Sequence, residues 1–492
     1  MTAKSPADAS TIRPRAVQAT SAKATPWLTV LWHPALDRVG DVAPVSGRLS
    51  RLEPELAVPG GAPPAPLADP HVSRTPALLT SLADGGMRIE ADPAVELLID
   101  GAPGPRELDA AALARGVVLE LAGRVALLLH LRRPPTGGPP QGFVGASEAV
   151  EALRADIARV ADLDVPVLVA GETGSGKEHV ARALHAGSTR AGKAFVAVNM
   201  ATLPPSMAVS QLFGHARGAF TGADRNHTGF FEQAAGGTLF LDEVADAQPE
   251  VQAMLLRTLE TGEIQPIGAD ARRVDVRVIA ASDADLVDDS EFRPQLYHRL
   301  AGYRITVPPL RARPDDIGRL LASFLVRELA SASAADRVSN TEELPWLPTA
   351  AVRELVRYSW PGNVRELANV ARHLAVIGRT GPITLADAVA PLRTPIPVAT
   401  PEGPRQITDD MVVAALAANR WKTSAAAGAL GVSRTTLYAL MDRCSRLRKA
   451  RDLDRDEIAT CRTETGGDLD LMSERLQVSK RGLQLRIREL GM

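Results

Sequence analysis

The segment VPVLVAGETGSGKE, residues 165–178, places an apolar run directly before a glycine-rich turn that ends in Gly-Lys. In such a turn consecutive backbone N–H groups converge on phosphate oxygens, and the N-terminus of a following helix adds positive potential. Lys177 can reach the outer phosphates. The pattern therefore predicts a strand, a phosphate-binding loop and a helix, as in an α/β nucleotide-binding fold. The predicted nucleotide-binding residues of this loop are Gly171, Glu172, Thr173, Gly174, Ser175, Gly176, Lys177 and Glu178.

A second motif supports this site. GGTLFLDEV, residues 236–244, ends an apolar strand with Asp242 and Glu243. One carboxylate can hold Mg²⁺ and the next can polarise the attacking water. Taken singly, the two motifs have structural alternatives: a glycine-rich turn, and a strand end that reaches solvent. Because they occur in this order and both at strand ends, they predict binding of a nucleoside triphosphate with Mg²⁺.

Proline-rich and glycine-rich stretches divide the 492 residues into blocks. Short alternating runs in the first block predict a β-sandwich, and apolar β-branched runs between helical patterns in the middle block predict a covered parallel sheet. The predicted fold class is multidomain: N-terminal β-sandwich, central α/β P-loop domain and all-α C-terminal block; the family resemblances given below imply a helical lid on the central domain and a helix-turn-helix at the C-terminus. The expected parts are a disordered tail 1–25, sandwich 26–132, linker 133–141, P-loop domain 142–392 with its lid from about 312, linker 393–404, helix-turn-helix 405–451 and a second helix-turn-helix-like repeat 452–492.

The net charge of −2 gives no overall attraction to nucleic acid or membranes, so any such binding requires a local patch. The most apolar run, VVLELAGRVALLLHL, contains Glu120 and Arg124. With two cysteines and no apolar leader, the chain is expected to be cytoplasmic.

The middle block resembles the AAA+ domain of bacterial enhancer-binding proteins, the ATPases that activate sigma-54 RNA polymerase. The motifs that carry the resemblance are GETGSGKE, FVAVN, LFGHARGAFTGA, GGTLFLDE, FRPQLYHRL, VPPLRARPDDI and WPGNVREL. The resemblance implies an ATP-dependent transcription activator that binds upstream sites on double-stranded DNA and remodels the sigma-54 holoenzyme. The alternatives are a nucleotide-binding DNA adaptor or repressor with little hydrolysis, and a AAA+ remodeller of another substrate, against which GAFTGA argues.

The resemblance also implies roles for single residues. The GAFTGA loop would grip sigma-54, although Phe220 could instead be a buried hairpin tip. Asn199 would act as the switch partner of Glu243, and Arg365 as the sensor II arginine. Arg293 and Arg299 would reach a neighbour's nucleotide, which requires a homo-oligomer, expected as a hexameric ring; the alternative for them is a solvated helix face. The residues expected to contact sigma-54 are Gly218, Ala219, Phe220, Thr221, Gly222 and Ala223.

Two positions depart from the family pattern. Asp283 stands where the family has the sensor I asparagine, and a carboxylate there would repel phosphates unless a cation offsets it. Pro294 directly follows the first predicted finger, Arg293. We therefore expect ATPase activity, but its rate cannot be predicted because of the Asp283 carboxylate.

The segment 409–443 resembles the Fis-type helix-turn-helix. Residues 405–451 carry nine Lys/Arg against three Asp/Glu, the local patch that phosphate contact requires. Ser433, Arg434 and Thr436 are the expected DNA-binding residues, at the N-terminal end of the third helix. A protein-docking helical domain is the alternative.

An internal repeat follows at a shift of 46 residues, where ALGVSRTTL, 429–437, aligns with RLQVSKRGL, 475–483. Residues 452–492 have seven Lys/Arg against nine Asp/Glu, so only the final helix could contact DNA, and dimer packing is an equal alternative. The basic residues of that helix are Lys480, Arg481, Arg486 and Arg488.

The first block resembles a forkhead-associated domain, a β-sandwich that binds phosphothreonine. Arg48, Ser73 and Arg74 match its phosphate-contacting positions, but Pro76 replaces the expected histidine. A phosphothreonine protein or its kinase is therefore one expected partner, and a purely structural sandwich is the alternative.

Overall fold

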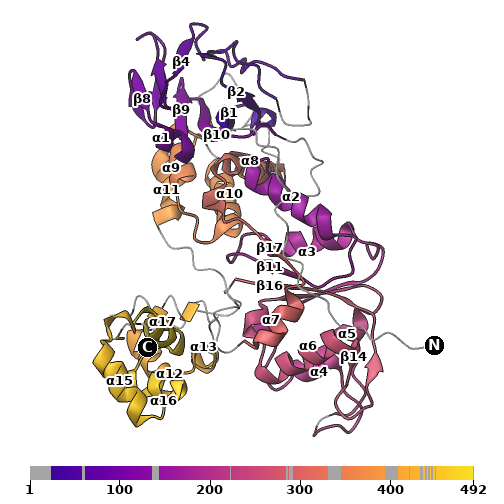
Figure 1. The fold of residues 1–492 in the computed structure, drawn as a ribbon. Helices are drawn as coiled ribbons and strands as arrows, with labels where there is room; N and C mark the ends of the chain where they lie inside the picture. Colours follow the sequence, from indigo (N-terminus) through magenta and orange to yellow (C-terminus); the bar gives the residue numbers. More distant parts are fainter. Residues whose placement is uncertain are drawn as a thin grey trace, which may run out of the picture. The chain divides into compact units, whose positions relative to one another are not determined.

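The computed structural model in Figure 1 describes most of residues 24–490. The described ranges are 24–57, 61, 63–135, 143–221, 223–283, 286, 292–330, 345–379, 381–393, 408–419, 421–430, 432, 436–437, 440–441, 444, 447–448 and 450–490. Along these ranges no helix has both the length and the apolar character that a membrane span needs. The chain forms two compact units, one of residues 1–159, 173–179 and 307–398, and one of residues 160–172, 180–306 and 399–492.

The N-terminal part of the first unit is a sandwich of a six-stranded and a four-stranded sheet. The strand orders are β2-β1-β10-β9-β6-β7 and β3-β4-β5-β8. The larger sheet consists of β1 (Thr25–Trp32), β2 (Val42–Pro44), β6 (Leu97–Ile99), β7 (Ala102–Pro103), β9 (Val117–Leu121) and β10 (Val125–Arg132). The smaller sheet consists of β3 (Arg48–Leu49), β4 (Ala77–Ser81), β5 (Met87–Glu90) and β8 (Arg106–Leu108), and a short helix, α1 (Ala110–Arg115), precedes β9.

The two sheets differ in what covers them. In β5 buried and exposed residues alternate, as expected for a strand with one face in water. In β10 nearly every residue is buried, because successive side chains enter two different cores. Leu127 and Leu129 pack inside the sandwich, whereas Ala126 and Leu128 pack against the helical lid.

The lid consists of four helices of the first unit, α8 (Pro314–Ala330), α9 (Thr349–Arg357), α10 (Asn363–Ile377) and α11 (Leu385–Arg393). Its core is continuous with the outer face of the larger sheet, where Trp32 stacks on Trp346 with ring centroids 6.4 Å apart. A Cβ added at Gly318 of α8 would lie 2.1 Å from the carbonyl oxygen of Leu31. Only glycine therefore allows α8 to lie this close to β1.

Ion pairs join the sandwich and the lid at the edge of this core. The Arg353 guanidinium lies 2.5 Å from Glu120, a carboxylate that is 1% exposed. Arg357 donates to Asp100 at 2.6 Å, and Asp100 also accepts from the backbone N–H of Val118. The sandwich and the lid thus share one apolar core with charged pairs at its margin.

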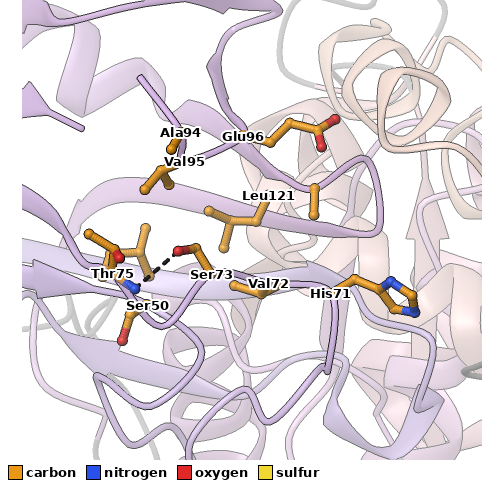
Figure 2. Close-up of a pocket in the computed structure, with 11 residues that line it drawn as sticks. Ser50, His71, Val72, Ser73, Thr75, Ala94, Val95, Glu96 and Leu121 are labelled. Carbon is orange, nitrogen blue, oxygen red and sulfur yellow. Dashed lines mark hydrogen bonds between the residues drawn. The ribbon is translucent and has the colours of Figure 1, made fainter. Parts of the chain in front are cut away.

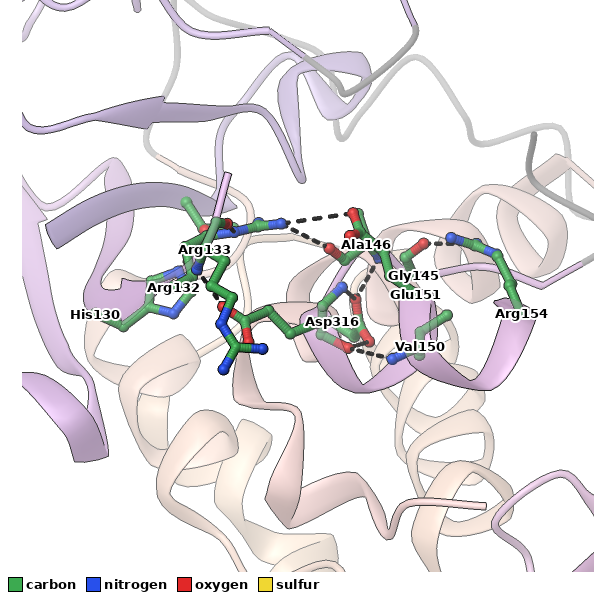
Figure 3. A network of polar contacts seen from close by, with 12 residues as sticks. His130, Arg132, Arg133, Gly145, Ala146, Val150, Glu151, Arg154 and Asp316 are labelled. Carbon is green, nitrogen blue, oxygen red and sulfur yellow. Dashed lines mark hydrogen bonds and ion pairs between the residues drawn. The ribbon is translucent and has the colours of Figure 1, made fainter. Parts of the chain in front are cut away.

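A polar network links the end of β10, the start of α2 (Glu148–Val160) and the start of α8 (Figure 3). The Asp316 carboxylate accepts from the N–H groups of Ala146 and Ser147 at 2.6 and 3.0 Å, and from the Ser147 hydroxyl at 2.6 Å. Arg132, at the end of β10, donates to the carbonyl of Ala146 at 3.1 Å. A buried carboxylate of the lid therefore caps α2, and an arginine of the sandwich holds the same turn.

The second unit contains a parallel five-stranded sheet of order β12-β13-β16-β11-β17. Its strands are β11 (Val167–Ala170), β12 (Phe195–Asn199), β13 (Thr238–Asp242), β16 (Arg277–Ser282) and β17 (Tyr303–Thr306). The apolar core of this unit includes residues of α4 (Ala208–Phe213), α5 (Phe230–Gln233), α6 (Pro249–Thr261) and α7 (Pro294–Leu300), and a small hairpin pairs β14 (Glu263–Ile264) with β15 (Arg272–Arg273). Each apolar run that predicted a strand here forms one, and nearly every residue of β11, β13 and β16 is buried, as in a sheet covered on both faces.

The C-terminal part of the second unit is helical. Its first group contains α12 (Asp409–Ala418) and α13 (Thr423–Leu430), and its last group contains α15 (Arg455–Glu464), α16 (Leu469–Leu476) and α17 (Lys480–Glu489). The predicted fold class is confirmed: a strand-rich N-terminal part, a central α/β domain with a helical lid, and a helical C-terminal part. The predicted tail 1–25 lies almost entirely outside the described residues, as do most of the two predicted linkers.

Candidate functional site

The predicted phosphate loop lies between the end of β11 and the first residue of α3 (Lys177–Ala186). It begins where Gly171 donates its N–H to Ser282 at 3.1 Å. Gly174 and Gly176 have φ of +75° and +110°, a region that glycine enters at little cost. Ser175 and Lys177 are 3% and 6% exposed, whereas Glu178 is exposed in the first turn of α3. The loop therefore has the backbone geometry that the sequence predicts.

The lid holds this loop from one side. A Cβ at Gly174 would lie 2.4 Å from the carbonyl oxygen of Gly362, and Val364 donates its N–H to Gly174 at 3.0 Å. Asn363 is completely buried; its amide donates to the carbonyl of Thr173 at 3.1 Å and accepts from the N–H of Leu310 at 2.8 Å. Sequence reasoning missed Asn363. The signal was present in WPGNVREL, where a Pro-Gly-Asn turn precedes the predicted Arg365.

Two arginines of the lid lie close to the loop. Arg365 is exposed, and its N–H points to the Gly174 carbonyl at 3.4 Å. Arg313 is buried and donates to the Ser175 carbonyl at 3.2 Å. Burial lowers the pKa of Arg313, although the carboxylates of Asp316 and Asp315 oppose that shift. Arg313 was not predicted from the sequence, and it positions the loop through its backbone.

The predicted carboxylates occupy the carboxyl edge of the parallel sheet. Asn199 at the end of β12 is in register with Asp242 at the end of β13. Glu243 follows with φ 51° and ψ 48°, and its N–H points back to the Asp242 carboxylate at 3.1 Å. Asp283 follows β16 at the same edge. The sheet thus brings the predicted switch asparagine beside the two carboxylates, since parallel strands end at one edge.

The left-handed backbone of Glu243 is uncommon for a residue with a side chain. Such conformations cost of order 1–3 kcal/mol and are concentrated at functional sites. Asn199 also caps a short turn, where its side chain accepts from the N–H of Ala201 at 2.9 Å. Both residues are therefore fixed by their local backbone.

The two predicted fingers lie at the ends of α7. Arg293 precedes the helix, and its N–H donates to the buried side chain of Gln252 at 2.9 Å. Pro294 is the first helical residue, where the missing N–H costs nothing. Arg299 is exposed and lies 3.4 Å from Glu260 of the same chain. Both side chains are solvated in this single chain, so the geometry fits either interpretation of them.

The GAFTGA segment forms a turn on the second unit. Its base is fixed where His215 pairs with His227 and with Ile267, and Gly218 donates to the carbonyl of Ala223 at 2.8 Å. Phe220 is 45% exposed, with its ring edge-on to His215 at 4.9 Å. Thr221 is also exposed and Ala223 is buried. Phe220 is therefore not the buried hairpin tip of the alternative, while Gly222 lies outside the described residues.

The three residues proposed for phosphopeptide contact do not converge on one cavity. Ser73 lines a cavity of about 140 Å³ with Ser50 and Thr75, and its hydroxyl accepts from the N–H of Thr75 at 3.0 Å (Figure 2). Arg74 lines a separate, more open depression beside Arg51. Arg48 is exposed, 3.2 Å from Glu53.

Of the predicted DNA-binding residues, Ser433 and Arg434 lie outside the described residues. Thr436 is exposed, and the neighbouring Leu437 is completely buried, as expected for a core position.

Three family models match consecutive segments of the chain between residues 143 and 443. The sigma-54 interaction domain matches residues 143–306, the AAA+ ATPase lid domain residues 311–401, and the bacterial regulatory protein, Fis family, residues 404–443. The transcriptional regulatory protein ZraR of Escherichia coli K12 is 41% identical over 312 residues, which cover 61% of this chain and 68% of ZraR. The chain belongs to the sigma-54 activator family.

Other similar proteins are matched over different shares of their own length. The nitric oxide reductase transcription regulator NorR1 of Cupriavidus necator is 48% identical over 271 residues, covering 54% of this chain and 51% of NorR1. The solved structure of NtrX from Brucella abortus in complex with ATP is 31% identical, with a TM-score of 0.45 and coverage of 62% of this chain and 69% of that one. The chain spans about half the length of several curated relatives that it matches.

Proposed function

We propose that this chain binds and hydrolyses ATP with Mg²⁺, binds double-stranded DNA, and uses the GAFTGA turn to remodel the sigma-54 RNA polymerase holoenzyme. One observation carries the proposal: a phosphate loop, a carboxylate pair at a strand end and an exposed Phe220 turn occur together in a chain of this family.

The residues of the loop fit a bound nucleotide. The Ser175 hydroxyl is buried and has no hydrogen-bond partner among the residues that the structure describes. A buried polar group without a partner costs about 1–3 kcal/mol, and a phosphate oxygen would relieve that cost. Lys177 would neutralise phosphate charge and Arg365 would reach the nucleotide from the lid.

The carboxyl edge would supply the hydrolytic chemistry. Asp242 would hold Mg²⁺, whose charge would offset that of the phosphates and of Asp283. Glu243 would orient and polarise the attacking water as a general base. Asn199, next to it in register, would restrain the Glu243 side chain until hydrolysis is required.

The exposed Phe220 provides the first test. Because it lies on a turn apart from the strand ends, Phe220→Ala should leave ATP turnover within about twofold of wild type, while transcription from a sigma-54 promoter should fall to background. We would measure phosphate release and transcript in the same preparation. Val326→Ala, which removes an equally exposed apolar side chain from the lid, is the matched control. Loss of ATP binding in Phe220→Ala would contradict the assignment.

The proposed ring is tested by substitutions at the two ends of α7. If Arg299 serves a neighbour's nucleotide, Arg299→Ala and Arg293→Ala should each bind ATP and lose hydrolysis by about 10³-fold. Wild-type turnover per subunit should also rise with protein concentration, since the site requires two subunits. Arg257→Ala, an exposed arginine of α6 that donates to Gln265, should leave turnover unchanged. Hydrolysis that is independent of concentration and survives both changes would support the solvated-face interpretation.

The sandwich is tested with phosphothreonine peptides. If Arg48 and Arg74 donate charge-assisted hydrogen bonds to the phosphate, replacing either by alanine should weaken binding by roughly ten- to a hundredfold. Binding of a phosphothreonine peptide library to the full chain would be compared with that of its unphosphorylated counterpart. Arg88→Ala, an exposed arginine paired with Glu107, is the control. If the wild-type chain shows no phosphate-dependent binding, the result supports the alternative, a purely structural sandwich.

A further inference from the structure

The two C-terminal helical groups are copies of one fold, in register at the 46-residue shift. Helix α12 begins at Asp409 and α15 at Arg455; α13 begins at Thr423 and α16 at Leu469. Each pair of helices also has the same length. The correspondence therefore extends over the first two helices of each copy, well beyond the nine aligned residues of the sequence motif.

The local hydrogen bonds repeat at the same shift. Thr408 and Asp454 cap their helices through the side chain, accepting from the N–H groups of Met411 and Glu457. After the first helix, the N–H of Trp421 donates to Leu416 at 2.8 Å, and that of Gly467 donates to Arg462 at 2.9 Å. Trp421 and Gly467 both have positive φ, +60° and +82°.

The buried positions repeat as well. Val412 corresponds to Ile458, Ala426 to Met472, and Leu437 to Leu483, and all six side chains are buried. The second copy has its own apolar core, formed by Leu453, Ile458, Cys461, Met472, Leu476, Val478 and Leu483. It is thus a complete three-helix unit, although the Fis-type family model matches only residues 404–443.

Charge is distributed unevenly over this second unit. Helix α17, which occupies the place of a recognition helix, has four Lys/Arg and one Asp/Glu, whereas α15 and α16 together have three Lys/Arg and five Asp/Glu. Part of the acidic charge is paired internally, as between Glu464 and Arg475 at 2.8 Å. The net negative charge of residues 452–492 therefore lies outside α17, which is locally basic.

The two sides of α17 also differ, one being apolar and buried and the other polar. Leu483 is buried and Ile487 packs against the core, while Gln484 is half-buried and Arg488 is exposed. Ser479 caps the helix by accepting from the N–H of Gly482 at 3.1 Å, at the position that Ser433 has in the first copy. Arg486 donates to the carbonyl of Leu453 at 3.0 Å, so it holds α17 in place.

We propose that residues 455–489 form a second DNA-binding module, in which α17 enters the major groove of a duplex and one chain contacts two sites. Lys480 and Gln484 lie toward the N-terminal end of α17, where base edges are reached, and Arg488 would contact phosphate. A dimer interface would need an apolar centre depleted of charge, and the described side chains Gln484 and Arg488 do not provide one. The inference uses the proposed DNA binding by the first module, and its test separates the two.

The test uses the full chain and a labelled random-sequence duplex, with the affinity measured by anisotropy over a range of salt concentrations. Each phosphate contact contributes close to one unit to the slope of log affinity against log salt, so Lys480→Ala and Arg488→Ala should each reduce the slope by about one. Arg462→Ala removes an exposed arginine from α15 of the same unit and should change nothing. Circular dichroism would verify that each variant is folded.

A fourth variant, Arg434→Ala, removes a predicted DNA-binding residue of the first module. Weaker binding in Arg434→Ala, together with reduced slopes in the α17 variants, supports two modules. Weaker binding in Arg434→Ala alone overturns the second module and leaves the first intact. Duplex binding that none of the four variants alters overturns the second module and also contradicts the proposed DNA binding through Arg434. A change of sedimentation in Lys480→Ala or Arg488→Ala, without a change of slope, assigns α17 to self-association instead.

Discussion

Glu243→Gln should bind ATP as the wild type does and turn it over at least about a hundredfold more slowly. The amide keeps the size of the side chain and its place after β13, but it cannot accept a proton from water. A positioned general base contributes typically about 10²–10⁴-fold, equivalent to roughly 3–5 kcal/mol of barrier. We would measure nucleotide affinity by equilibrium binding and turnover by phosphate release.

The control for this variant is Glu250→Gln, an exposed glutamate at the start of α6 seven positions along the chain. It should hydrolyse ATP at the wild-type rate. Normal turnover by Glu243→Gln would show that Glu243 is not the general base of hydrolysis. A wild-type chain that binds ATP without measurable turnover would favour the adaptor or repressor alternative and point to Asp283.

Arg353→Ala should destabilise the boundary between the sandwich and the lid by about 3 kcal/mol. It leaves the Glu120 carboxylate, 1% exposed, without the guanidinium that lies 2.5 Å away. Breaking a buried pair from one side costs about 3–5 kcal/mol, and the low end applies because Arg353 itself is 20% exposed. Unfolding by denaturant would be followed through tryptophan fluorescence, to which Trp32 and Trp346 at this boundary contribute.

Two further variants make the comparison specific. Arg372→Ala breaks a pair with Glu328 on the lid in which the arginine is 59% and the carboxylate 21% exposed, and it should cost less than about 1 kcal/mol. The double variant Glu120→Leu with Arg353→Leu removes both charges and should recover most of the lost stability. Equal destabilisation by Arg353→Ala and Arg372→Ala would show that burial of Glu120 has no energetic consequence.

Much of the central domain could be predicted because its strands β11, β13 and β16 are covered on both faces. An apolar β-branched run such as that of β13 has few other interpretations, and Asp242 at its end locates the carboxyl edge. The position of Asn199 relative to Asp242 depends on strand order and register, which the sequence does not contain; the family resemblance provided it.

Other features depend on contacts between distant segments. The continuous apolar run of β10 indicates that both faces are buried, but it does not say that lid helices some two hundred residues later cover one of them. Asn363 was missed for the same reason, because its partners Thr173 and Leu310 are remote in sequence. The separate depressions lined by Ser73 and Arg74 reflect loop conformations that adjacent positions in a motif do not determine.

The core that the sandwich and the lid share limits how a regulatory signal received by the sandwich could act on the nucleotide-binding domain. A sensory domain on a loose tether can be released at little cost, but here release would expose Leu31, Trp32, Val118, Ala126 and Leu128 together with the lid residues that they touch. Returning those five side chains alone to water would cost on the order of 5–10 kcal/mol, comparable to the whole stability of a domain. A signal received by the sandwich would therefore have to travel as a small rearrangement through α8 and α10 toward Gly174, without detachment of the sandwich.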